Sequence, residues 1–230
     1  MNIYFLAEGK TENKVYSAWL SYLAPNIRKI SFFDEPDENT YKIVNANGQP
    51  FYPEISDAIN EVNSVEKYDY LVICLDAEEN SVDEIRADIH CFLEKEKLKL
   101  NHAELILIVQ NRCMETWFLG NRKIYSRNPQ NPVLSEYTNY YDVSAHDPEK
   151  MGKYRGFNTH AHFHEAYLQA LFAEKNLSYT KKYPGHVLDE TYLNQLKARI
   201  HYEPDHLKSF WNFIKFCNSI HSNANASEKS

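Results

Sequence analysis

The chain has 230 residues, of which 43% are apolar and 25% charged, and its formal net charge is -7 at pH 7. This length can bury a full core and form one domain, or one domain with an appended helical part. The negative charge argues against a protein that holds long duplex DNA by bulk electrostatics, because such affinity comes from neutralising phosphates with Lys and Arg. No apolar run approaches a membrane span, and the first residues form a strand pattern rather than a signal segment, so we expect a cytoplasmic protein without a membrane segment.

Cysteine spacing and missing motifs exclude several kinds of chemistry. The four cysteines, Cys74, Cys91, Cys113 and Cys217, are far apart in the sequence, so we expect reduced, mostly buried thiols. The sequence contains no G-x-x-x-x-G-K-[ST] loop and no G-x-S-x-G elbow. Acyl transfer is therefore disfavoured, and any ATPase activity would have to come from a partner.

Strands and helices alternate along the first half of the chain, as judged from apolar runs and helical spacing. In chain order we expect a strand over 2–7, a helix over 12–23, a strand over 27–33, a loop or short hairpin over 34–53, a helix over 55–65, a strand over 68–75, a helix over 81–98 and a strand over 104–110. This order predicts an α/β fold with a parallel sheet flanked by helices on both faces.

The pattern changes after Asn111. We expect a short helix over 114–119, an irregular segment rich in Pro, Asn and Tyr over 125–147, and helices over 160–171, 192–200 and 206–220. The predicted organisation is an α/β domain over 1–122, an irregular and helical extension over 123–222 that packs on it, and a disordered polar tail over 223–230.

Carboxylates follow three of the predicted strands. Glu8 follows the first strand, Asp76 and Glu78 follow the buried strand over 68–75, and Glu115 follows the strand over 104–110. Open α/β sheets place their sites at the carboxyl ends of strands, and magnesium prefers a few carboxylates with water and substrate phosphate. A single carboxylate at a strand end more often caps a helix or faces water, so the signal lies in their combination.

These acidic segments resemble the two signature motifs of the Toprim fold. The first is Phe5-Leu6-Ala7-Glu8-Gly9-Lys10-Thr11-Glu12, and the second is Leu71-Val72-Ile73-Cys74-Leu75-Asp76-Ala77-Glu78. The fold is shared by topoisomerases, bacterial primases, recombination proteins and the overcoming-lysogenization-defect nucleases. The resemblance implies acid-base catalysis or metal binding for Glu8, and magnesium binding for Asp76 and Glu78. Two positions depart from the family pattern, because Glu78 replaces an Asp, and Ala7 stands where the family often has a β-branched or other apolar residue.

Two further segments extend the resemblance over most of the chain. Residues 111–119, Asn-Arg-Cys-Met-Glu-Thr-Trp-Phe-Leu, are similar to the Glu-x-Trp helix of small bacterial Toprim-like proteins, some of which occur with defence ATPases. Tyr179-Thr180-Lys181-Lys182-Tyr183 and His206-Leu207-Lys208-Ser209-Phe210 resemble the C-terminal pattern of the same proteins, a Lys-rich turn followed by His-x-x-Ser-Phe.

The resemblance implies a magnesium- or manganese-dependent nuclease that acts on DNA or RNA in bacterial defence or repair. Phosphodiester hydrolysis requires an activated water and stabilisation of phosphate charge, so metal at Asp76 and Glu78, with Glu8 as acid-base group, is chemically sufficient. We expect Glu115 to complete the metal shell or fix a basic partner. The candidates for phosphate binding are Lys10, Arg112, Lys181 and Lys182.

Two alternatives of other classes stay open. The chain is either a non-catalytic module that docks on an ATPase or another effector, or an enzyme that transfers or hydrolyses phosphate on a small nucleotide. A homo-oligomer is compatible with each of them.

Two weaker features concern histidines and tyrosines. His160, His162 and His164 have helical spacing that suits a shared transition metal, but the sequence offers no third ligand, and surface histidines are the commoner case. The tyrosines between Tyr125 and Tyr141 form either a base-stacking platform or an aromatic cover over the sheet edge, and burial favours the cover.

Overall fold

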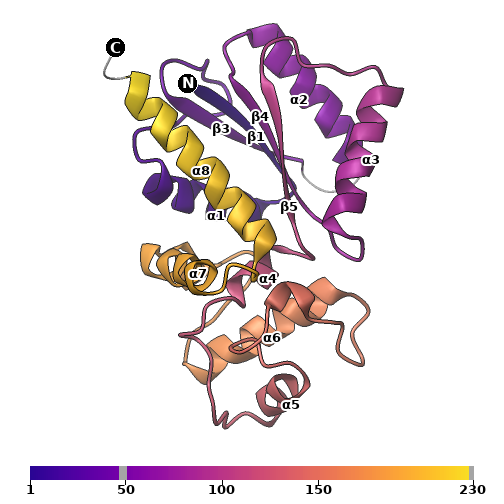
Figure 1. Cartoon of the computed structure of the whole chain (residues 1–230), viewed down its shortest axis with the longest axis vertical. Helices are drawn as coiled ribbons and strands as arrows, with labels where there is room; N and C mark the ends of the chain where they lie inside the picture. Colours follow the sequence, from indigo (N-terminus) through magenta and orange to yellow (C-terminus); the bar gives the residue numbers. More distant parts are fainter. Residues whose placement is uncertain (47–50, 228–230) are drawn as a thin grey trace. The chain divides into compact units, whose positions relative to one another are not determined.

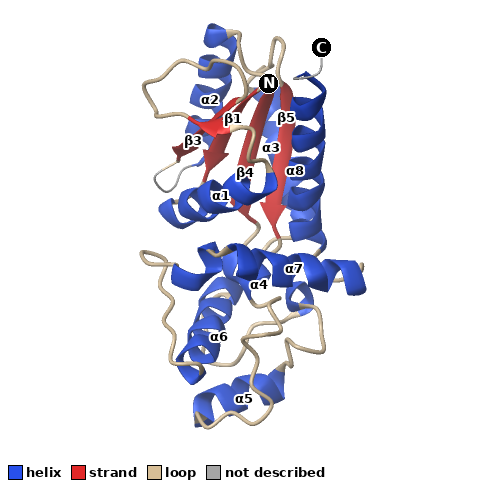
Figure 2. Ribbon diagram, turned by 90° about the vertical axis from the view of Figure 1, so that its left-hand side faces the viewer, coloured by secondary structure: helices blue, strands red, loops and turns tan. Residues whose placement is uncertain are grey.

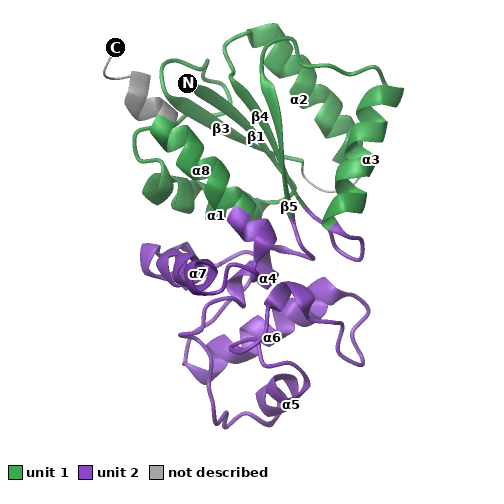
Figure 3. Cartoon of the chain, in the orientation of Figure 1, with its two compact units in different colours: residues 1–75, 82–109, 212–230 green, residues 76–81, 110–211 purple. Residues whose placement is uncertain are grey.

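The computed structural model describes residues 1–46 and 51–227, with side chains up to residue 222. The described elements are β1 Asn2–Ala7, α1 Lys10–Leu23, β2 Arg28–Lys29, β3 Thr40–Asn45, α2 Phe51–Val65, β4 Tyr70–Asp76, α3 Val82–Lys95, β5 Glu104–Gln110, α4 Met114–Phe118, α5 Pro132–Tyr140, α6 His160–Glu174, α7 Glu190–Tyr202 and α8 Lys208–Ser227, with short 3-10 turns over Pro148–Lys150 and Gly185–Leu188 (Figure 1). They form two compact units (Figure 3).

The first unit contains residues 1–75, 82–109 and 212–230 and is built on the predicted parallel sheet. Its strand order is β2-β3-β1-β4-β5. The central strand β1 pairs in parallel with β3 and with β4, and Ala7 lies opposite Asn45 on one side and Cys74 on the other. The α/β fold class is therefore confirmed, and β1 and β4, which carry the two motif segments, are direct neighbours.

Helices cover both faces of this sheet (Figure 2). On one face, Phe5 of β1 contacts the rings of Tyr16 from α1 and Phe216 from α8. On the other face, the Tyr4 hydroxyl donates to Glu61 of α2 over 2.9 Å. Residues 3–7 are buried without a break, as expected for a parallel strand covered on both sides.

Two predictions for residues 27–53 are wrong. The strand expected over 27–33 is limited to β2, and residues 40–45, expected to be loop or hairpin, form strand β3. Lys42 lies inside this strand and is buried, but its ammonium pairs with Glu61 over 2.9 Å. Residues 47–50 of the expected loop lie outside the described residues.

The second unit contains residues 76–81 and 110–211 and is helical. Its boundary differs from the predicted one at 122, and α8 begins in this unit and continues in the first. Within residues 125–147, expected to be irregular, α5 forms with Pro132 in its first turn and the Asn131 side chain accepting the Val133 N–H. The α8 helix continues to Ser227, into the segment expected to be a disordered tail, and residues 228–230 lie outside the description.

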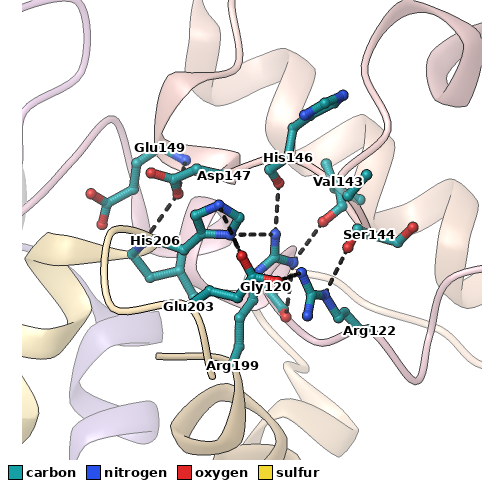
Figure 4. Close-up of polar contacts among 12 residues, drawn as sticks. Gly120, Arg122, Val143, Ser144, His146, Asp147, Glu149, Arg199, Glu203 and His206 are labelled. Carbon is teal, nitrogen blue, oxygen red and sulfur yellow. Dashed lines mark hydrogen bonds and ion pairs between the residues drawn. The ribbon is translucent and has the colours of Figure 1, made fainter. Parts of the chain in front are cut away.

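A buried arginine network holds the loops of the second unit together (Figure 4). The Arg199 guanidinium donates to the carbonyls of Val143 and His146 over 2.6 Å each and to that of Gly120 over 3.3 Å. His206 accepts a further hydrogen bond from Arg199. Burial and the charge of Arg122 lower the pKa of Arg199 to about 10, so it stays protonated at neutral pH.

The cysteine prediction is confirmed, because all four thiols are free and only Cys91 is exposed. In the part of the chain that the structure describes, no helix is both long enough and apolar enough to cross a membrane.

Candidate functional site

The first motif lies in the first unit. Glu8 is partly exposed and directly follows β1, one position beyond Ala7. Lys10 is exposed and is the first residue of α1, which starts after Gly9. Both residues therefore lie at the carboxyl end of the central strand, as the sequence predicted.

The second motif ends β4 and enters a tight turn. Asp76 is the last residue of the strand, and the Asn80 N–H donates to the Ala77 carbonyl over 2.9 Å, which closes a turn. Glu78 is exposed and has a φ of 51°, a left-handed conformation that is uncommon for a residue with a side chain. Its peptide N–H donates to the Arg112 carbonyl over 2.8 Å. This turn sets the direction in which Glu78 leaves the backbone.

The Arg112 side chain binds this turn, residues 76–80, which we call the acidic turn. Its Nη1 donates to the carbonyls of Glu78 over 3.0 Å and Asn80 over 3.2 Å. Arg112 also has a positive φ of 73°. The guanidinium expected to bind phosphate therefore positions the turn that carries Asp76 and Glu78.

The neighbouring carboxylate, Glu79, is bound to α6. It accepts hydrogen bonds from the backbone N–H of His160 over 2.7 Å and from its ring Nδ1 over 2.8 Å. Burial opposes ionisation, but these hydrogen bonds and the charge of Lys153 lower the pKa of Glu79. Glu79 therefore fixes the acidic turn to the start of α6.

Glu115 is the most deeply buried of the candidate carboxylates. The residue is 1% exposed, in the short helix α4. Its Oε1 accepts a hydrogen bond from the Tyr179 hydroxyl over 2.7 Å and lies 4.0 Å from Nζ of Lys181, whose side chain is half exposed. A buried carboxylate requires such partners, because burial without compensation is strongly unfavourable.

The charges of Asp76 and Glu115 both act on Lys181. Burial would lower the pKa of Lys181, but the charges of Glu115 and Asp76 outweigh it and raise that pKa. Burial and the same two carboxylates raise the pKa of the Cys113 thiol. Burial and Glu115 also raise the pKa of Glu165. Two carboxylates of the second unit therefore share one ammonium group.

The other lysine of this turn has a different environment. Lys182 is exposed, and its Nζ lies 5.2 Å from the centre of the Tyr183 ring. Lys181 therefore faces the buried carboxylate, whereas Lys182 lies at the surface.

The three histidines serve different contacts. His160 binds Glu79, whereas buried His164 contacts the Thr116 hydroxyl through Nδ1 over 2.7 Å. Burial and the charge of His160 lower the pKa of His164 to about 3. Among the residues covered by the structure, no group of three or more His, Cys, Asp or Glu side chains is arranged to hold a metal ion.

The motif over residues 111–119 contacts the motif over residues 206–210. The Trp117 indole N–H donates to the Ser209 hydroxyl over 2.6 Å, and the Trp117 and Phe210 rings meet edge to face with centroids 5.4 Å apart. Ser209 also accepts the backbone N–H of Asn111 over 3.1 Å. These residues fix α4, and with it Glu115, to the start of α8.

Sequence reasoning missed three participants, Tyr179, Glu165 and Glu79. Tyr179 stood within a quoted motif, but a single tyrosine carries no signal for a buried carboxylate 64 positions away. Glu79 was visible beside Glu78, and only the fold assigns it to His160.

No family model, curated protein or solved structure matches the chain.

Proposed function

We propose that the chain is a magnesium-dependent phosphodiester hydrolase that cleaves nucleic acid. The observation that carries the proposal is the pairing of β1 with β4. Ala7 and Cys74 are register partners, so Glu8 follows one partner by one position and Asp76 follows the other by two. Acidic residues at the carboxyl ends of adjacent parallel strands stand where open α/β sheets carry their sites.

The donor chemistry fits a hard cation. The negative charges of Glu115 and Asp76 both raise the pKa of Lys181, and this negative potential supports the binding of a cation. Magnesium needs only one or two carboxylates, because water and substrate phosphate complete its shell. Asp76 and Glu78 would hold the ion, which when bound lowers the pKa of a coordinated water and neutralises phosphate charge.

The residues of the chain have distinct roles in this proposal. Glu8 accepts a proton from water or returns one to the leaving oxygen. Lys181 stays protonated beside Glu115 and its side chain is half exposed, so we assign to it the contact with a phosphate oxygen. Arg112 keeps the acidic turn in place through the carbonyls of Glu78 and Asn80.

The test is cleavage of labelled single-stranded DNA, duplex DNA and tRNA with magnesium or manganese. We expect cleavage by the wild type that EDTA abolishes, and a loss of at least about 100-fold in Asp76→Asn and in Glu8→Gln, on the scale of removing a group that acts in the transition state. The matched control is Asp83→Asn, an exposed carboxylate in the first turn of α3. Intact substrates with pure wild type under all these conditions would refute the proposal.

A second candidate, a docking subunit for an ATPase or another effector, is favoured by one observation. Phe33 is 92% exposed and Phe32 55% exposed, and their rings meet edge to face 5.3 Å apart. Exposed aromatic pairs of this kind are typical of interaction surfaces. A docking subunit keeps its partner after Glu8→Gln and loses it after Phe33→Ser, as measured by size-exclusion chromatography of the mixed proteins.

A further inference from the structure

A cationic segment lies in the second unit of this acidic chain. Residues 150–158, Lys-Met-Gly-Lys-Tyr-Arg-Gly-Phe-Asn, contain three cations and no acidic residue, whereas the whole chain has a net charge of -7. Lys150, Lys153 and Arg155 are all exposed. Lys150 ends a 3-10 turn, and residues 151–158 are irregular and lead to α6. The three cations of this segment are therefore accessible to solvent.

Aromatic rings lie directly against this segment. Tyr140, at the end of α5, is 42% exposed, and its ring centroid is 5.0 Å from that of the partly exposed Tyr154. Beneath them, Phe163 of α6 stacks on Tyr154 at 5.5 Å, and Tyr137 is only 8% exposed. Tyr137 therefore belongs to the core of the helical second unit and not to the expected cover over the sheet edge, whereas Tyr140 is partly exposed.

Hydrogen bonds hold these groups in place. The Tyr140 hydroxyl donates to the Lys153 carbonyl over 3.2 Å, and the Tyr154 hydroxyl donates to Glu136 over 3.1 Å. A side chain at Gly152 would bring its Cβ within 2.8 Å of the Tyr140 hydroxyl, so the glycine permits this close approach. The Arg155 guanidinium lies 5.8 Å from the Tyr154 ring centre, within cation–π range.

The segment also adjoins the acidic turn within the same unit. It ends just before His160, whose backbone and ring bind Glu79. The Lys153 ammonium donates to the Asn158 carbonyl over 3.0 Å, two positions before His160, and its charge contributes to lowering the pKa of Glu79. A polyanion bound along residues 150–158 would therefore pass beside the turn that begins at Asp76.

We propose that Lys150–Asn158 and Tyr140 form a binding site for single-stranded nucleic acid. Bases stack on Tyr140 and Tyr154, and phosphates contact Lys150, Lys153 and Arg155. Single strands are favoured because their unpaired bases expose the faces that aromatic platforms bind, whereas a duplex buries them. This inference rests on the proposed function, since it names the substrate class of the same site.

The test is binding without catalysis. Fluorescence anisotropy is measured in EDTA and low salt with a labelled 20-nucleotide oligothymidine and with a labelled 20-base-pair duplex. We expect the wild type to bind the single strand more tightly, and Tyr154→Leu to weaken it by about 5- to 100-fold, the range of one stacked base. Tyr154→Phe retains the ring and should bind as the wild type does.

The cations have a matched control in the first unit. Lys153→Ala with Arg155→Ala should weaken oligothymidine binding at least about 10-fold and make it less steeply dependent on salt, because phosphate contacts release counterions. Lys95→Ala with Lys99→Ala removes two exposed cations from the region of α3 and should change neither property. Equal losses in the two double variants, or unchanged binding in Tyr154→Leu, would overturn the inference.

This experiment separates the two proposals. A chain that binds oligothymidine through Tyr154 but cuts nothing supports the binding site and refutes the nuclease. A chain that cuts nucleic acid while Tyr154→Leu binds normally supports the nuclease and refutes the binding site.

Discussion

Replacing Arg199 with methionine tests whether the second unit depends on its buried arginine network. Arg199 is 2% exposed and supplies hydrogen bonds to the carbonyls of Gly120, Val143 and His146 (Figure 4). Each buried acceptor left without a donor costs about 1–3 kcal/mol. Removing the guanidinium also removes the cost of burying its charge. We therefore expect Arg199→Met to lower the free energy of unfolding by about 3–5 kcal/mol, near the bottom of the range obtained by summing the three acceptors.

The assay is urea unfolding followed by tryptophan fluorescence and by circular dichroism. The control is Arg122→Met, because the Arg122 side chain is 36% exposed and donates to the Ser144 carbonyl and to Glu203. We expect this control to lose at most about 1 kcal/mol, as for an exposed ion pair. If Arg199→Met lost no more stability than Arg122→Met, the three carbonyls would be forming hydrogen bonds with water in the variant. The network would then not hold the loops together.

Three other predictions concern buried or crowded groups. The pKa of His164 is lowered from 6.5 to about 3 in the folded chain, so protonation of this histidine favours unfolding. As the pH drops from 6.5 towards 3, the free energy of unfolding should fall by up to about 1.4 kcal/mol per pH unit. His164→Gln should remove that slope in unfolding curves measured from pH 7 to 4. Tyr179→Phe removes the hydroxyl that donates to Glu115 and should lower the free energy of unfolding by about 1.5–3 kcal/mol, and a loss under about 0.5 kcal/mol would contradict this. Gly152→Ala forces a methyl group against the Tyr140 hydroxyl and should weaken oligothymidine binding several-fold in the anisotropy assay, whereas wild-type affinity would show that Tyr140 need not be fixed.

The sequence predicted the sheet where apolar residues run without interruption. Strands β1 and β4 were visible because parallel strands buried on both faces have continuous apolar runs, and β5 has a similar apolar run although its first four residues are at least partly exposed. Strand β3 was missed because Lys42 interrupts its apolar pattern and acidic and turn-forming residues surround it. Lys42 is tolerated there through its ion pair with Glu61, a partner 19 positions away that local pattern cannot reveal.

The candidate site was predictable in its residue types and less so in its contacts. Glu8 and Asp76 were identified because carboxylates directly after apolar strands are a local signal. The role of Arg112 was not predicted. Its contacts to the Glu78 and Asn80 carbonyls depend on a positive φ and on a turn 32 to 34 positions earlier. Helix α5 was missed because Pro132 and its Asn and Tyr residues suggested an irregular segment, although proline is well suited to a first helical turn.

The arrangement of charge distinguishes the candidate carboxylates from one another. Glu115 is buried and already compensated by Tyr179 and Lys181, so bringing a cation to it would compete with contacts that burial requires. Asp76 ends a strand and its Oδ1 is buried, whereas the neighbouring Glu78 is exposed and needs no such compensation. Metal binding in the proposed function therefore belongs to Asp76 and Glu78, and Glu115 acts by holding Lys181 protonated and in place.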